Sequence, residues 1–190
     1  GVFYVCFIHA AEPSEPNGGC RIRRIGSKGF IMKIRIICVG RLKEKFYTDA
    51  VNEFRKRLGR FAEVEITELA DERAPEGLSP AELEQVKAAE CSRILEKISR
   101  EDTVIALDIA GKQLSSPELA DKLSYYMLNG RSRLVFVIGG SNGLNDSVLH
   151  RADFRLSFSK LTFSHQIFRI MLLEQIYRAF KIMNNEPYHK

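Results

Sequence analysis

From residue 32 onward, strand-like and helix-like patterns alternate, and this alternation restricts the fold more than any other feature of the chain. Short apolar runs are separated by longer segments whose apolar residues recur at helical spacing. Strands are expected at residues 33–39, 64–69, 103–109, 134–138 and 155–159, and helices at residues 44–58, 81–98, 117–128, 145–151 and 166–183. Strands that alternate with helices form a parallel sheet with helices on both faces. We therefore expect an α/β fold that binds ligands beyond the carboxyl ends of its strands.

Local signals support the ends of two of these helices. Ser79 followed by Pro80 is typical of a helix start, with the serine as N-cap. Ser116 is expected to cap the next helix in the same way, and Asn129 with the glycine after it is expected to end that helix.

The first 31 residues differ from the rest of the chain. An apolar start leads into Pro, Gly and Ser and then into basic residues, whereas a secretory signal carries its positive charge before the apolar segment. Met32 then opens a strand-like run, as in many small α/β domains. We expect residues 1–31 to be a disordered, non-native or read-through extension, and residues 32–190 to form a single domain.

A glycine-rich turn follows the apolar run at 134–138. Gly139, Gly140 and Gly143 allow the backbone to turn sharply and to approach another group closely. The turn lacks the lysine of a phosphate-binding P-loop and does not match the dinucleotide pattern Gly-x-Gly-x-x-Gly. It does match Gly-x-Ser-x-Gly, in which Ser141 would be the nucleophile of a serine hydrolase with the α/β-hydrolase fold.

The hydrolase hypothesis has both support and objections. Asp146, Asp153, His165 and His189 follow Ser141 in the chain order of hydrolase triads. However, the domain is small for that fold, no His-Gly-Gly-Gly segment precedes the turn, and the helix after it is short and polar. A sharp turn that binds no ligand is also consistent with these residues.

The last expected helix, residues 166–183, is apolar around most of its circumference. One apolar stripe can face the sheet, but the remainder needs another cover. Twofold dimers are the commonest oligomers, so we expect a homodimer through this helix, with Ile176 in the contact. Glu174 and Arg178 are spaced to pair on its narrow polar side.

Four segments together resemble one known family. They are MKIRIICVGRLKEKF, VIGGSNGL, LSFSKLTFSHQIFRIMLLEQIYRAFKI and EPYHK. They closely resemble the SPOUT-class methyltransferase H family of large-subunit ribosomal RNA, and the resemblance extends from Met32 to Lys190. Ser164 stands where that family usually has proline. Ser141 and Asn142 stand where it often has Pro-Glu, so the resemblance argues against a nucleophilic serine.

The resemblance implies a fold and an activity that spacing alone does not reveal. The implied fold is the parallel-sheet α/β-knot (SPOUT) fold with a C-terminal trefoil knot, in a cytoplasmic homodimer. The implied cofactor is S-adenosylmethionine, and the implied reaction is methylation of N3 of a pseudouridine in helix 69 of 23S ribosomal RNA on the assembled 70S ribosome. No metal or membrane is implied. A non-catalytic RNA-binding knot domain is the alternative within the same fold.

The resemblance also assigns site residues. The implied cofactor slot is formed by Leu107, Gly139, Phe158, Ser159, Lys160, Leu161, Thr162 and Phe163. In this interpretation the glycines let the backbone approach a nucleoside cofactor. The tail is expected to form the acceptor site, where His189 could take the N3 proton and Tyr188 could stack on or orient the base, although a frayed terminus is the ordinary alternative.

Three basic residues are candidate RNA contacts, namely Arg169, Arg178 and Lys190. For Arg169 and Arg178, contact with the cofactor carboxylate and simple ion pairing are equally good interpretations. His165 is expected to be structural.

Composition adds few constraints. The net charge of +5 fits an acidic partner without requiring one. The four cysteines lack the spacing of a metal site, which favours small apolar side chains in a reducing cytosol.

Overall fold

The computed structural model describes all residues except 1–3, 6–22, 25–31, 73–74, 76 and 189–190. Its strands are β1 (Tyr4–Val5), β2 (Arg23–Arg24), β3 (Met32–Val39), β4 (Ala62–Leu69), β5 (Thr103–Gln113), β6 (Arg133–Ile138) and β7 (Phe154–Ser157). Its helices are α1 (Lys45–Leu58), α2 (Pro80–Glu96), α3 (Ser116–Leu128), α4 (Asp146–Arg151) and α5 (His165–Met183).

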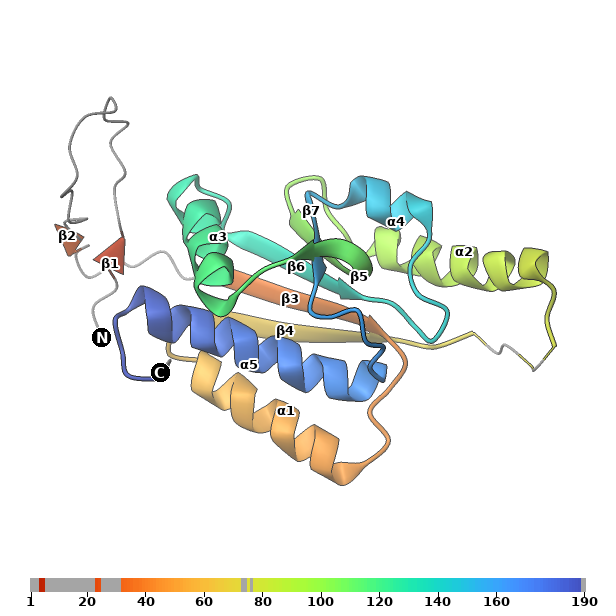
Figure 1. Ribbon diagram of the computed structural model, residues 1–190, viewed down its shortest axis with the longest axis horizontal. Coiled ribbons are helices and arrows are strands. Elements are labelled where there is room, and N and C mark those ends of the chain that lie inside the picture. The colour runs from red at the N-terminus through yellow and green to blue at the C-terminus, as the bar shows by residue number, and fades with distance from the viewer. Residues whose placement is uncertain (1–3, 6–22, 25–31, 73–74, 76, 189–190) are drawn as a thin grey trace.

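Five strands form one parallel sheet in the order β4-β3-β6-β5-β7, so the parallel α/β prediction is confirmed (Figure 1). The trefoil knot stays a prediction. Strand β5 continues four residues past its expected end, because a register shift between Leu107 and Lys112 lets it pair with β7 a second time.

The predicted extension lies mostly outside the described residues. Within it, only β1 and β2 are described, and they pair in antiparallel orientation. The expected disorder of residues 1–31 therefore stays a prediction.

Alternating strand residues supply two apolar layers. On one face, Ile34 and Ile36 pack with α1, α3 and α5, and on the other, Ile37 and Val39 pack with α2 and α4. This two-sided burial explains why the strand segments are almost continuously apolar. In the described part of the chain, no helix has both the length and the hydropathy to cross a membrane.

The helix starts follow the expected chemistry closely. Ser79 caps α2 in a capping box with Glu82, as predicted. The cap of α3 is Ser115 rather than Ser116, because Ser115 accepts from the Glu118 N–H and Glu118 reaches back to it. Helix α3 ends at Asn129, and Gly130 takes a left-handed conformation.

Helix α5 lies between α1 and α3 (Figure 1). These two helices cover apolar surface of α5 that the sequence-based prediction assigns to a second subunit. Ile176 is completely buried within its own subunit. The expectation that Ile176 lies in a subunit contact is therefore wrong, since packing of α5 in the layer already covers it.

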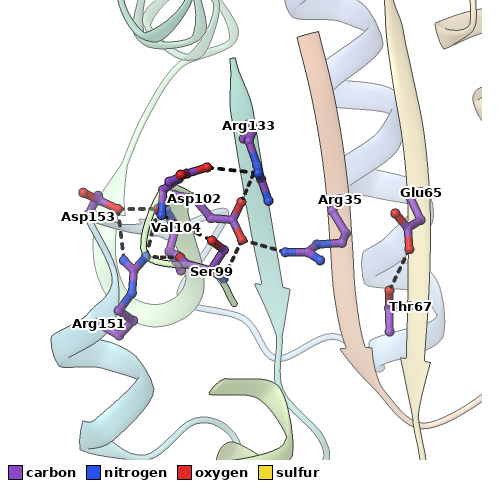
Figure 2. Close-up of polar contacts among 10 residues, drawn as sticks. Arg35, Glu65, Thr67, Ser99, Asp102, Val104, Arg133, Arg151 and Asp153 are labelled. Atoms are coloured by element: carbon purple, nitrogen blue, oxygen red, sulfur yellow. Dashed lines mark hydrogen bonds and ion pairs between the residues drawn. The ribbon is translucent and has the colours of Figure 1, made fainter. Parts of the chain in front are cut away.

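At the amino ends of the strands, a buried carboxylate joins three segments (Figure 2). Asp102 is only 4% exposed. It accepts hydrogen bonds from Arg35 Nη2 at 2.7 Å, from Arg133 Nε at 3.0 Å and from the Ser99 N–H at 2.8 Å. The carboxylate thus links β3 and β6 to the turn that precedes β5.

We expect Asp102→Asn to destabilise the fold. The substitution keeps the shape but leaves the two arginines without their shared negative partner, which should lower the free energy of unfolding by about 3 kcal/mol. Urea unfolding measures this loss. The matched control is Glu101→Gln, because Glu101 binds Arg133 at 3.2 Å on the surface and its loss should cost about 0.5 kcal/mol or less. Equal effects of the two changes would contradict this role for Asp102.

Candidate functional site

A cavity of about 620 Å³ lies at the carboxyl ends of β6 and β7 and beside the middle of β5. Its walls come from residues 107–109 of β5, where its pairing with β6 ends, the glycine turn after β6, the loop after β7 and the start of α5. The lining residues are Leu107, Asp108, Ile109, Ile138, Gly139, Gly140, Ser141, Asn142, Gly143, Leu144, Leu156, Ser157, Phe158, Ser159, Leu161, Thr162, Phe163, Ser164, His165 and Phe168. The volume is typical of a small-molecule site, and the position is the one where parallel sheets bind ligands.

The structure brings together seven of the eight residues expected to hold the cofactor. Leu107, Gly139, Phe158, Ser159, Leu161, Thr162 and Phe163 all line this cavity. Lys160 is exposed and does not line it. The contact of each residue with a cofactor stays a prediction.

The glycines of the turn are needed for a reason different from the one expected. Gly143 has a φ of +80°, and its N–H donates to the Gly140 carbonyl at 3.1 Å. A Cβ on Gly139 would lie 2.8 Å from the Gly143 backbone. The turn closes on itself, so these glycines serve the chain's own packing before they serve any ligand.

A buried acid that no sequence pattern predicts lies behind the turn. Glu90 of α2 is 3% exposed, and its Oε2 would be 2.9 Å from a Cβ on Gly140. Its Oε1 accepts the Glu72 N–H at 3.0 Å, while Oε2 has no hydrogen-bond partner among the described residues. Burial raises the pKa of this carboxyl. Glu90 thereby joins the loop after β4 to the back of the glycine turn.

The loop after β7 is held by its own serines. The Ser157 hydroxyl donates to the Ser159 carbonyl at 3.2 Å, and Ser159 Oγ accepts the Leu161 N–H at 3.0 Å. Ser164 caps α5 by accepting the Ile167 N–H. Serine therefore supplies a helix start where the resembling family usually has proline. This local bonding fixes an irregular loop as a cavity wall.

The start of α5 is anchored under the cavity by Arg169, which is completely buried. Its guanidinium pairs with Glu68 on β4 and donates to the Gly40 carbonyl just after β3. A guanidinium enclosed in this way is not available to RNA, so the RNA-contact interpretation of Arg169 is wrong for this conformation and the ion-pair interpretation holds.

His165 packs beside this anchor. Its Nε2 would lie 2.8 Å from a Cβ on Gly40, whose φ is +89°. Burial lowers the pKa of His165, and the nearby Arg169 lowers it further. The imidazole is therefore neutral near pH 7 and packs against the backbone, as its expected structural role requires.

The cavity has little net charge. Its described lining contains no lysine or arginine, and Asp108 is paired with Arg155 Nε at 2.8 Å. Ser141 is exposed and makes no hydrogen bond to a described histidine. A serine nucleophile needs such a base within reach, so this geometry does not favour the hydrolase.

The tail lies far from this cavity. Helix α5 starts at the cavity with His165 and runs for 19 residues, or roughly 28 Å, before the tail begins. Figure 1 accordingly shows the described segment that follows α5 at the end of that helix opposite the carboxyl ends of the strands. His189 and Lys190 lie outside the described residues, so their expected roles cannot be placed.

Tyr188 is described and is packed rather than frayed. Its ring contacts the Tyr177 ring edge-on at a centroid distance of 5.0 Å, and the Arg178 guanidinium lies 4.8 Å from its centroid. Arg178 also pairs with Glu174 at 2.6 Å, which confirms the expected i,i+4 pair. Burial and the Glu174 carboxylate raise the pKa of Tyr188, so its phenol stays neutral at ordinary pH.

Comparison with known proteins places these features in a family. Residues 32–189 match the family model described as predicted SPOUT methyltransferase. Among solved structures, the chain is similar to a probable methylase family protein from Haemophilus influenzae, with 15% identity, a TM-score of 0.49 and coverage of 83% of this chain and 70% of that one. It is also similar to a candidate methyltransferase from Legionella pneumophila solved with bound SAM, with 13% identity, a TM-score of 0.44 and coverage of 78% and 66%.

The family model spans the whole parallel sheet, the cavity and the tail as far as residue 189, whereas the two structural likenesses are distant. On the strength of that match, the chain belongs to the SPOUT methyltransferase family.

Proposed function

We propose that this protein is an S-adenosylmethionine-dependent methyltransferase that modifies N3 of a pseudouridine in helix 69 of 23S ribosomal RNA on the assembled ribosome. The observation that carries the cofactor proposal is the cavity at the carboxyl ends of the strands, lined by seven of the eight residues expected to hold the cofactor. The target nucleotide is supported by the resemblance of the glycine turn, the loop after β7 and the tail to the rRNA methyltransferase H family.

The residues of the cavity fit this cofactor. S-adenosylmethionine combines a nucleoside with a sulfonium cation and has no phosphate. The described lining has no lysine or arginine, and His165 is neutral because burial lowers its pKa. Such a wall does not repel a cation, and it gives a phosphate no lysine or arginine side chain to pair with. Phe158, Phe163 and Leu107 supply apolar surface for an adenine ring.

The bound cofactor would supply an activated methyl group, transferred by direct displacement. The chain's own part is chiefly alignment. The closed glycine turn and the serine-braced loop after β7 form rigid walls, and Phe168 packs against Phe158 and Phe163 at centroid distances of 4.9 and 6.2 Å. These walls would hold the donor in one orientation.

The acceptor nitrogen must lose its proton during the reaction. Tyr188 keeps its own proton at ordinary pH because its pKa is raised, so it is suited to orient or stack on the base. We assign proton removal to His189, whose ordinary pKa lies near neutrality.

A tail that begins roughly 28 Å along α5 from the cavity cannot reach the cavity of its own subunit. We therefore propose a homodimer in which each cavity is completed by the partner's Tyr188 and the partner's His189. A groove of about 640 Å³ between α1, α3 and α5, lined by Phe54, Ile170 and Met171, is the proposed contact face. Ile167 beside it is 41% exposed, so this face still carries uncovered apolar surface.

The function is tested on ribosomes that lack the modification. Wild-type protein with labelled S-adenosylmethionine should label one pseudouridine of helix 69, as mapped by nuclease digestion and mass spectrometry. Ser141→Ala should retain most of this transfer, because Ser141 makes no hydrogen bond to a described histidine, and a fluorophosphonate probe should leave Ser141 unmodified. Absence of transfer together with stoichiometric probe labelling would favour the hydrolase, and RNA binding without transfer would favour the non-catalytic domain.

Deletion of residues 188–190 separates the acceptor site from the cofactor site. Calorimetric affinity for S-adenosylmethionine should stay within a few-fold of wild type, since the tail is proposed to act on the acceptor base and not on the cofactor. Single-turnover methyl transfer should fall by about a hundredfold, the contribution of positioned acid–base groups. Unchanged transfer would mean that the tail has no part in the reaction.

A further inference from the structure

The chain reverses direction directly after α5. Asn185 has a φ of +52°, and it is the only non-glycine among the described residues with a positive φ. The Asn185 N–H donates to the Ile182 carbonyl at 3.0 Å, and the Glu186 N–H donates to the Lys181 carbonyl at 2.9 Å. Asparagine tolerates this left-handed conformation better than most residues. The turn folds the tail back against the end of α5 instead of letting it continue into solvent.

Glu186 then holds the reversed tail through two cations from different parts of the chain. Its Oε2 accepts from Lys181 Nζ on α5 and from Arg60 Nη2 in the connection between α1 and β4, each at 2.5 Å. The Lys181 ammonium, followed by Arg60, holds the pKa of Glu186 below its usual range. The carboxylate is therefore charged at neutral pH and spans a sequence separation of 126 residues.

Two residues further on, Tyr188 is fixed by its own contacts. Its carbonyl accepts from Arg178 Nη1 at 3.4 Å, and its ring lies between Tyr177 and the Arg178 guanidinium. The hydrogen bond to the carbonyl is long, and a hydrogen bond from the Tyr188 phenol to the Glu174 carboxylate adds to it. The firm ionic contact before Tyr188 is the one at Glu186.

We propose that Glu186 is a positioning residue, which through Arg60 and Lys181 holds the tail so that Tyr188 is presented to the acceptor nucleotide. This inference rests on the proposed methyl transfer and adds a residue to it. The Lys181 side chain is 12% exposed, but Glu186 is 33% and Arg60 is 52% exposed, so solvent screening keeps the contribution of these pairs to global stability small. We call the contact of Glu186 with Arg60 and Lys181 the tail clamp. The clamp therefore acts by ordering a terminus that would otherwise fray, which raises the fraction of time in which the acceptor site is assembled.

The test uses the full-length protein with Glu186→Gln, Arg60→Met, and the two changes combined. Glu186→Asp serves as the conservative variant. The control is Glu84→Gln, which makes the same charge change in a pair with Lys87 on α2, away from the tail. The measurements are hydrogen exchange of the amides at 185–188, thermal midpoint, calorimetric affinity for S-adenosylmethionine, and single-turnover transfer to ribosomes.

Glu186→Gln should speed exchange of these amides roughly tenfold and slow transfer several-fold. Its thermal midpoint and cofactor affinity should match those of Glu84→Gln. The combined variant should be no slower than Glu186→Gln alone, because the two groups act through one contact. Glu186→Asp should recover part of the loss.

The possible failures are distinct. Unchanged exchange in Glu186→Gln would overturn the clamp. Faster exchange with unchanged transfer would overturn the positioning role alone. Wild-type protein that transfers no methyl group would overturn the proposed function, and the positioning role with it.

Discussion

The buried Arg169 guanidinium is the interaction on which the arrangement of this protein depends. A buried cation must be paired, and its acceptors, Glu68 and the Gly40 carbonyl, both lie at the carboxyl ends of neighbouring strands. Helix α5 is therefore obliged to begin at that edge of the sheet. The loop that leads into α5 becomes a wall of the cavity, and the rest of the helix must run back across the sheet towards the amino ends.

This direction of α5 determines how the site can work. It separates the cavity from the tail by nearly the full length of the helix, and it leaves an apolar groove beside α1 and α3 where a second subunit can pack. The cavity walls lie at the start of α5 and the anchored tail lies at its end. In the proposed dimer, the cavity of one subunit and the tail of its partner together form one site. The glycine turn fits the same picture, since its glycines close the turn on itself and Glu90 supports it from behind. The cavity is thus preformed, and in the proposed dimer the partner's tail completes it.

Much of the fold could be predicted from the sequence, because strands buried on both faces and helices with serine caps leave strong local patterns, as at Ser79. The residues expected to hold the cofactor were inferred from a family resemblance, and the structure gathers most of them at one edge of the sheet. Other features left no local signal. The burial of Arg169 and Glu90 depends on segments distant in sequence, and so does the extension of β5 by a second pairing with β7. The prediction that Ile176 lies in a subunit contact failed for a related reason. Apolar periodicity shows that a helix face is covered, but it cannot distinguish a neighbouring helix from a second subunit.

Subunit complementation tests the central claim most directly. One variant, Gly139→Val, has a disrupted cavity and an intact tail, because any Cβ at Gly139 would collide with Gly143. The other lacks residues 188–190 and keeps its cavity. Each alone should be nearly inactive. After subunit exchange of equal amounts, half of the dimers should be mixed, each with one complete site, so transfer should return to about a quarter of the wild-type rate. Mixtures as inactive as their parents would contradict a site shared between subunits.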